Sequence, residues 1–384
     1  MRTAFALLAG AGLVSAWSEL LHKPIMHKNI DAIVTPGTYT SHMHTFFGSD
    51  AITNVMPTTE DLQKGCYSGV NPNDLSAYCK SSNQLSSLSF IEVLTMLPGI
   101  PTLYHVDGDK FTEVPVFTFG TYYTAAYSEV PIPQNFSMIS GKATAQTQAE
   151  ANNPENGLVW YCEESPDKFE PDVAKMPTKA CRRHMRFSLL FPNCVDPDDI
   201  TVYAFSDSAT NKCPEGMKRM PQLRFSARYD TNAMAPNGWD GDAPFQLSCS
   251  DMPGAGYCFH GDFINGWYED AAEDMMVGGG SGRDDGRFIS GARGSSPTPA
   301  SCTPTDQDPE NGTSDYWESV EMMGNGSSDD DVSVPDSDQG TTPPSTSVPE
   351  PTEDPPACSA GTEFKRSIGK RSQDAAKLRR LRAV

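Results

Sequence analysis

Short runs rich in aromatic and β-branched residues recur along the chain between Pro, Gly and Asn residues, a pattern typical of β-strands. In residues 186–191 and 223–229 polar and apolar residues alternate, as expected of strands with one buried face. The clearest helix signal, Leu85–Leu97, ends at Pro98, and no alternation of strand and helix indicates a parallel sheet. We therefore expect a mainly β fold, an antiparallel sandwich or jelly-roll type with few short helices. The strands expected with most support are 114–123, 186–191, 201–205 and 222–229.

Composition divides the 384 residues into three parts. Residues 1–16 combine Arg2, the apolar stretch Ala4–Val14 and small residues up to Ala16, which is typical of a secretion signal. Residues 17–277 are long enough for a single β-rich globular domain. Residues 278–384 are rich in Ser, Thr, Pro, Gly and Asp and become basic at the C-terminal end. Such a segment buries too little apolar surface to fold, so we expect a disordered tail.

Charge and hydropathy exclude two classes of partner. The formal net charge of −21 argues against nucleic acid, because a backbone binder needs clustered cations to displace counterions. No apolar run reaches the length of a spanning helix, so we expect no transmembrane segment. We expect a monomer that is secreted and extracellular or associated with a cell wall.

Cysteine usage agrees with an oxidising compartment. The ten cysteines include no C-x-x-C pair, which favours disulfides over zinc thiolates. Eight cysteines alone allow 105 pairings, so the connectivity is a hypothesis. We expect neighbours to pair, each clipping a short loop: Cys66 with Cys79, Cys162 with Cys181, Cys194 with Cys213, and Cys249 with Cys258.

Three Asn-x-Ser/Thr sequons begin at Asn135, Asn311 and Asn325. In an exported chain these asparagines are candidate glycosylation sites on the surface.

Histidine is scarce, with seven residues, so its pairs carry information. His42 and His44 are two apart, and a strand would point both rings to one face. His260 and Asp262 repeat this spacing within an aromatic and glycine-rich stretch. The alternative is that all are hydrogen-bonded structural groups in a β core. If the fold joins them, the three rings and the acid could line a catalytic or metal-binding cleft.

Four segments resemble a secreted fungal domain of unknown function that is often found beside WSC carbohydrate-binding modules. They are Pro36–Ser49, with the start motif S-H-x-H-x-F-F-G-S, Phe191–Cys194, Met220–Leu223, and His260–Trp267, with the end motif H-G-D-F-x-x-G-W. The resemblance spans roughly residues 28–270. It implies a fungal secreted or cell-wall context and places His42, His44, His260 and Asp262 on signature positions. It implies no particular activity.

Three functions from different classes remain open, and the first and third involve extracellular or cell-wall polysaccharide. The first is a His/Tyr-dependent lyase or hydrolase. Its histidines would act as acid or base, Asp262 would orient an imidazole, and Tyr39 or Tyr257 would donate a proton. Asp262 lacks an obvious second carboxylate for a standard glycosidase pair, which favours the lyase.

The second function is a metal-dependent enzyme with His42, His44 and His260 as candidate ligands. The third is a non-catalytic glycan-binding wall protein, in which exposed aromatic residues stack on sugar rings. Candidate stacking residues are Trp160, Trp239, Trp267 and Tyr268, and the alternative for each is ordinary core packing. No nucleotide or hydrolase fingerprint is present, and the cofactor is unknown.

Overall fold

The computed structural model describes residues 17–79, 100–151, 157–163, 173–277, 289–294 and 300–325. All of these residues fall in one compact unit. Several expectations fall outside the described residues. They are the secretion signal (residues 1–16), the helix Leu85–Leu97, the side chain of Cys79, and the tail after residue 325.

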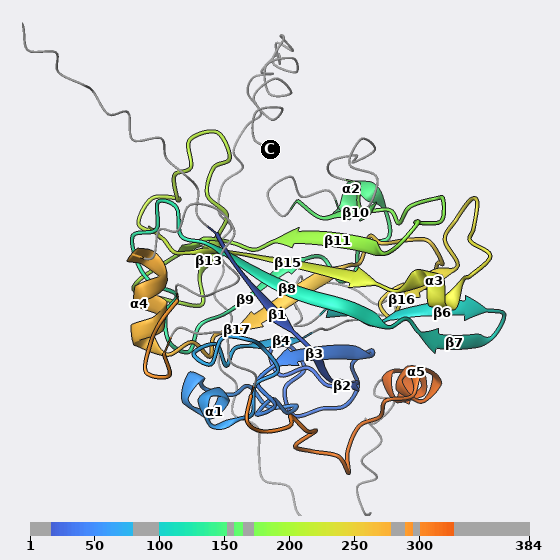
Figure 1. The fold of residues 1–384 in the computed structure, drawn as a ribbon, viewed down its shortest axis with the longest axis horizontal. Coiled ribbons are helices and arrows are strands. Elements are labelled where there is room, and N and C mark those ends of the chain that lie inside the picture. Colours follow the sequence, from blue (N-terminus) through green and yellow to red (C-terminus); the bar gives the residue numbers. More distant parts are fainter. Residues whose placement is uncertain are drawn as a thin grey trace, which may run out of the picture. The chain divides into compact units, whose positions relative to one another are not determined.

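Two antiparallel sheets form the body of the domain, as the mainly β expectation required (Figure 1). The first sheet has the order β1-β8-β15-β11-β10. Its strands are β1 (Trp17–His22), β8 (Val116–Thr124), β10 (Val159–Cys162), β11 (Met185–Leu190) and β15 (Gln222–Tyr229). The expected strands 114–123, 186–191 and 222–229 correspond to β8, β11 and β15. Buried residues largely alternate with half-buried ones in β11 and β15, for one buried face, whereas residues 119–123 of β8 are all buried. Of the expected strand 201–205, only the two-residue strand β13 (Tyr203–Ala204) forms.

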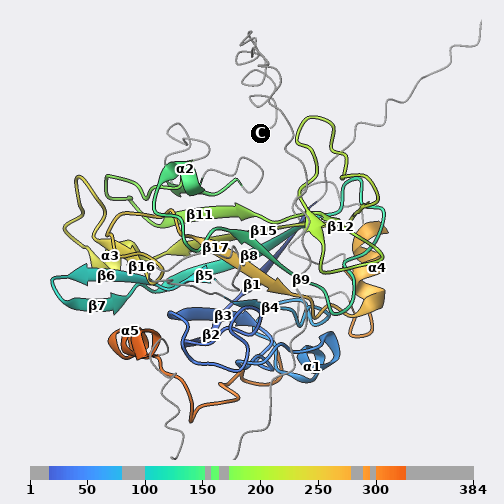
Figure 2. The same cartoon turned by 180° about the vertical axis from the view of Figure 1, so that it is seen from behind.

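The second sheet has the order β2-β3-β4-β17-β9, with β5 paired to β3. Its strands are β2 (Pro24–Lys28), β3 (His44–Gly48), β4 (Ala77–Cys79), β5 (Ile100–Pro101), β9 (Ser137–Gly141) and β17 (His260–Ile264). Seen from behind, β9 and β17 lie in front of β8 and β15 (Figure 2). The two motifs singled out by sequence therefore contribute strands of one sheet.

The main core lies between these sheets. The ring of Phe47 on β3 stacks on that of Phe119 on β8, with centroids 4.1 Å apart. Tyr78 on β4 reaches across to Tyr123 on β8 through a hydroxyl–hydroxyl bond of 2.8 Å. Burial of aromatic side chains from both inner faces supplies the main driving force for this packing.

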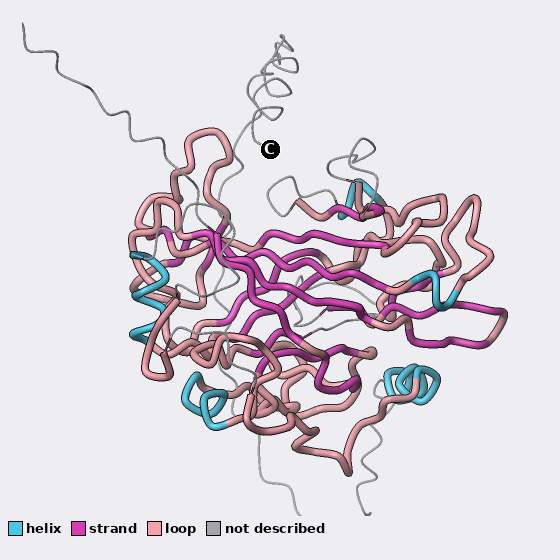
Figure 3. Tube along the Cα trace, viewed as in Figure 1, coloured by secondary structure: helices cyan, strands magenta, loops and turns pink. Residues whose placement is uncertain are grey.

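Two three-stranded sheets and five helices complete the described part of the chain, with the helices at its periphery (Figure 3). One small sheet has the order β13-β12-β14, and the other β16-β6-β7. Their strands are β6 (Leu103–Asp107), β7 (Lys110–Glu113), β12 (Cys194–Val195), β13 (Tyr203–Ala204), β14 (Lys218–Arg219) and β16 (Phe245–Leu247). The helices are α1 (Thr59–Lys64), α2 (Gln148–Ala151), α3 (Thr231–Met234), α4 (Glu269–Val277) and α5 (Tyr316–Asn325). None of them is long and apolar enough to cross a membrane.

Three of the four expected disulfides are confirmed: Cys162–Cys181, Cys194–Cys213 and Cys249–Cys258. The pairing of Cys66 with Cys79 was wrong, because Cys66 bonds to Cys302. Pairing by neighbours assumes that loops close locally. Cys79 instead ends a strand inside the second sheet, whereas residues after 300 return to the domain beside Cys66.

Beyond residue 277 the structure describes residues 289–294 and 300–325. Residues 300–325, here called the strap, are held by more than the disulfide. The ammonium of Lys28, nearly buried, pairs with Asp306 at 2.8 Å. Tyr316 of α5 stacks on Phe111 of β7 with centroids 4.0 Å apart. Composition hid this docking because the strap supplies only a few apolar anchors among many polar residues.

Candidate functional site

The two histidine motifs meet in space. The rings of His42 and His44 stack with centroids 4.9 Å apart, and the His260 ring lies edge-on at 5.9 Å from His42. His44 and His260 lie on neighbouring parts of the second sheet, next to a smaller hydrophobic cluster that includes Phe46 and Ile264. The structure thus brings the three rings together, which was the condition for a shared cleft.

These histidines are nevertheless buried, with exposed fractions of 1% or less. The Nδ1 atom of His44 lies 3.2 Å from the carbonyl oxygen of Lys28, and that of His260 lies 2.7 Å from the carbonyl oxygen of Cys258. A carbonyl at Nδ1 fixes the hydrogen on that atom and holds the ring in place. The geometry favours the alternative of structural histidines, and a catalytic role stays a prediction.

Asp262 does not orient a histidine through any hydrogen bond among the described residues. Burial raises the pKa of its carboxyl well above the ordinary value, and the nearby charge of Asp31 adds to the effect. Both causes favour the uncharged acid. Among the described residues, no three His, Cys, Asp or Glu side chains are placed to share a metal ion, so the geometry does not favour the three-histidine metal site.

The tyrosines proposed as proton donors lie elsewhere in the fold. Tyr39 donates its hydroxyl hydrogen to Asp308 of the strap, and this bond is the main reason that its pKa rises to about 12. Tyr257 is half-buried against the main core. Tyr39 thus serves to dock the strap.

The tryptophans expected to bind glycan are mostly core residues. Trp267 is fully buried and packs edge-on against Tyr123, and Trp160 is 4% exposed. Trp239 packs on Phe245 and donates its indole hydrogen to the carbonyl of Pro177 at 2.9 Å. The ring of Tyr268, half-buried, is covered by the guanidinium of Arg293 at 5.2 Å. These rings offer little open face for a sugar.

The described sequons differ in their surroundings. Asn135 is exposed, but its amide oxygen accepts a hydrogen bond from the backbone of Thr59 at 2.9 Å. Asn311 is exposed in the strap, and its amide donates to Asp308. Asn325 ends α5, and its side chain is outside the described set.

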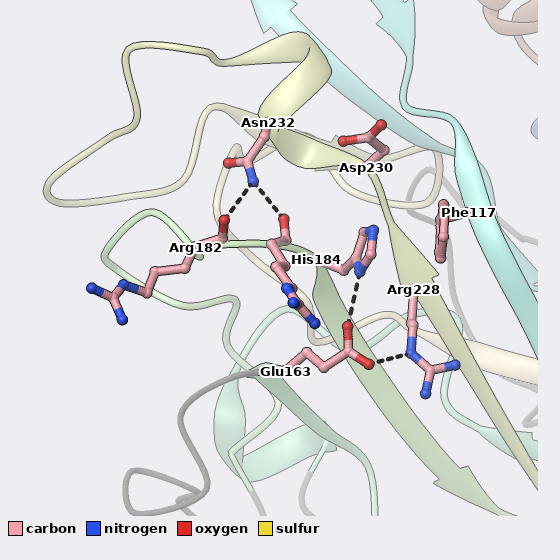
Figure 4. Close-up of a pocket in the computed structure, with 8 residues that line it drawn as sticks. Phe117, Glu163, Arg182, His184, Arg228, Asp230 and Asn232 are labelled. Carbon is pink, nitrogen blue, oxygen red and sulfur yellow. Dashed lines mark hydrogen bonds and ion pairs between the residues drawn. The ribbon is translucent and has the colours of Figure 1, made fainter.

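An open cavity of about 570 Å³ lies elsewhere, at the end of the first sheet (Figure 4). We call it the cationic pocket. It is lined by Phe117, Glu163, Arg182, Arg183, His184, Arg228, Asp230 and Asn232. Phe117 is 59% exposed, an unusual position for a large apolar ring.

Glu163 is the centre of this pocket. One carboxylate oxygen binds Nδ1 of His184 at 2.8 Å, and the other binds Nε of Arg228 at 2.6 Å. Partial burial works against the charged form of Glu163, but the bonds from His184 and Arg228 outweigh it and lower its pKa. The acid therefore stays ionised and fixes the side chains of His184 and Arg228 next to each other.

The Glu163 contact also determines which atom of His184 is available. A carboxylate at Nδ1 holds the hydrogen there, so the neutral ring presents Nε2 as an acceptor. No described residue hydrogen-bonds to Nε2 of His184. The ring stacks on Phe117 with centroids 4.2 Å apart and an angle of 18°. The pocket thus combines an acceptor nitrogen, a fixed cation and an apolar ring.

The loop of Arg182 and Arg183 is positioned by its backbone. The side-chain amide of Asn232 donates to both of their carbonyl oxygens, at 3.1 and 2.7 Å. Asp230 caps α3, because its carboxylate accepts a hydrogen bond from the backbone N–H of Ala233. The guanidinium of Arg182 points away from the Glu163 contacts (Figure 4).

Arg228 belongs to a row of arginines on the outer face of the first sheet. Arg186 on β11 lies directly opposite Arg228 on β15, an arrangement that costs stability unless acids balance it. Arg186 binds Ser226 at 2.8 Å and the hydroxyl of Tyr122 at 3.1 Å, and the guanidinium of Arg224 lies 4.2 Å from the Tyr122 ring centre. We call Arg186, Arg224 and Arg228 the arginine face.

Sequence reasoning missed this site although a signal was present. The alternating run 223–229 puts Arg224, Ser226 and Arg228 on one face of a strand, a face that was not singled out from the sequence. The sequence has one basic cluster at Arg182-Arg183-His184 and a second at Arg224 and Arg228. Two basic clusters in a chain with a net charge of −21 are a signal of an anion-binding surface. The position of Glu163 beside both clusters depends on strand pairing and could not be derived.

A scan against models of protein families matches residues 31–82 and 100–267 to a domain of unknown function, DUF1996. The chain belongs to this family. A search of curated proteins and a search of solved structures found no match. The DUF1996 match includes both histidine motifs and every residue that lines the cationic pocket, whereas β1 and the strap lie beyond it.

Proposed function

We propose that this protein is exported and binds an anionic extracellular polysaccharide, one with carboxylate or sulfate groups on its sugars, in the cationic pocket. The observation that carries the proposal is the pocket itself, where Arg228 and His184 are fixed around Glu163 beside the exposed ring of Phe117. The four disulfides are consistent with folding in an oxidising compartment.

The charge of the whole molecule makes a local cation cluster informative. With a formal net charge of −21, the protein repels polyanions at long range. At physiological salt this repulsion is screened beyond about 8 Å, so a polyanion is held only where cations lie within contact distance. Arg228 would bind the carboxylate or sulfate, and Phe117 would stack on the apolar face of a sugar ring.

A second candidate function at the same place is β-elimination of a uronate polymer, favoured by the acceptor Nε2 of His184. In that reaction Nε2 removes the hydrogen at C5, the C4–O bond breaks as a C4=C5 double bond forms, and the imidazolium returns the proton to the leaving oxygen. Arg228 would neutralise the carboxylate that makes this hydrogen acidic.

Binding is tested with the secreted protein and polygalacturonate, a glucuronan, a sulfated glucan and a neutral glucan. We expect binding to at least one charged polymer and none to the neutral glucan. The ultraviolet absorbance of unsaturated uronate products would reveal elimination. Binding without that absorbance would remove the second candidate only.

Two pairs of variants make this test specific. We expect Arg228→Gln to weaken binding at least tenfold, whereas Lys212→Gln, which removes an exposed cation outside the pocket, changes it less than twofold. We expect Phe117→Ala to weaken binding severalfold, whereas Tyr127→Ala, which removes a similarly exposed ring outside the pocket, has little effect. Equal losses within either pair, or retention of the neutral glucan alone, would contradict the proposal.

A further inference from the structure

We infer that the binding groove continues beyond the cationic pocket into a second subsite, which takes the next charged sugars of the same polymer. This inference rests on the proposed function. A second cavity, of about 630 Å³, lies alongside the ends of β1 and β8. Phe117 lines both cavities, so they adjoin at its ring.

The chemistry of the second cavity suits a charged sugar. Lys23 and Pro24, both exposed, lie on its rim together with Leu21, which is 38% exposed. Lys23 provides a cation for a second carboxylate or sulfate, and no described acid pairs with its ammonium. Leu21 provides apolar surface for the sugar ring.

The strap forms one wall of this subsite, and residues 67–70 form another part of its lining. Ala300, Cys302, Thr303 and Pro304 line the cavity, and the bond from Cys302 to Cys66 holds them there. Cys302 is the one exposed cysteine among the disulfides described, so its bond is the one that a reductant reaches first. Breaking this disulfide should therefore loosen the wall that the strap contributes to the second subsite.

The two-subsite groove makes affinity depend on chain length. We expect a long oligomer of the charged sugar found to bind to be held at least fivefold more tightly than a trimer, because only the longer chain reaches the second cavity. We expect Lys23→Gln to remove most of this length dependence and to leave trimer binding unchanged. Lys110→Gln, an exposed lysine on β7, is the matched control and should change neither.

The strap is tested by the double variant C66S/C302S, checked for a native fold by circular dichroism. We expect it to bind the trimer normally and to lose the advantage of the long oligomer. Normal trimer binding with no length dependence in the unmodified protein would overturn this inference but not the proposed function. Failure to bind any charged oligomer would overturn the proposed function and this inference with it. A length dependence that survives both Lys23→Gln and C66S/C302S would place the extra contacts elsewhere.

Discussion

Single residues in this fold owe their behaviour to burial more than to their chemical type. His42, His44 and His260 were chosen from sequence because histidines are common catalytic groups, yet their rings are sealed inside the domain. His184 received no attention from spacing, yet it lies in an open cavity against Glu163. A sequence displays which side chains can ionise but not which of them meet water, because exposure depends on what packs above each residue.

His22 provides a test at this scale. Burial lowers the pKa of its ring to about 3, and its Nε2 lies 2.9 Å from the hydroxyl of Thr121. Because the folded pKa is depressed, the unfolded chain gains the proton first. The contribution of His22 is complete above pH 6.5 and is lost as the pH falls toward 3. At pH 5 the loss is about 2 kcal/mol.

We expect His22→Gln, which keeps a hydrogen-bonding group near Thr121, to reduce the loss of unfolding free energy between pH 7 and pH 5 by about that amount. Urea unfolding at the two pH values measures it. Burial raises the pKa of Asp74 to about 6, so this group stabilises the folded state as the pH falls, opposite to His22. Both proteins contain Asp74, so its contribution cancels when their pH profiles are compared. Parallel pH profiles for the two proteins would contradict the assignment.

At the scale of elements, the strands were largely predictable and their partners were not. The alternation in 222–229 located β15 to the residue, because one face of the strand packs on the core. The choice of β8 and β11 as its neighbours is not visible in that pattern, since every half-buried strand alternates in the same way. The glycine of the His260-Gly261-Asp262 motif likewise has a reason that only packing explains.

Gly261 lies on β17 and faces side chains of the first sheet. A Cβ atom there would come within 2.9 Å of the Phe225 ring and 3.0 Å of Leu189. We expect Gly261→Ala to lower the free energy of unfolding by about 1–3 kcal/mol, because the added methyl group overpacks the core. Thermal unfolding measures the change. Gly324→Ala in α5, where a methyl group meets open space, is the control and should be neutral or slightly stabilising.

At the scale of the whole molecule, one covalent link joins the strap to the domain. The Cys66–Cys302 disulfide closes a loop of 236 residues, far longer than those of the other three bonds, whose separations are 19, 19 and 9. A long loop restricts the unfolded chain most. The ion pair of Lys28 with Asp306 and the stacking of Tyr316 on Phe111 add native contacts to the same strap.

Removing this disulfide should therefore cost more than removing a short-loop one. We expect C66S/C302S to lower the free energy of unfolding by up to about 5 kcal/mol, the loss of chain entropy for a loop of this length. The other three disulfides lie within this loop and reduce the loss. We expect limited proteolysis to cleave the variant first in the strap. Chemical denaturation under non-reducing conditions measures the change. A loss below about 1 kcal/mol would show that noncovalent contacts alone hold the strap.

The sequence by itself predicted the mainly β class, the positions of the principal strands and three of the four disulfide pairings. Each of these depends on residues close together along the chain or on a period of two. Only the tertiary structure decided that the histidines are buried, that Cys66 bonds to Cys302, and that Glu163 gathers Arg228 and His184 in an open pocket. These features arise where distant segments pack together, and hydrophobic burial that drives such packing is non-directional, so local patterns do not encode it.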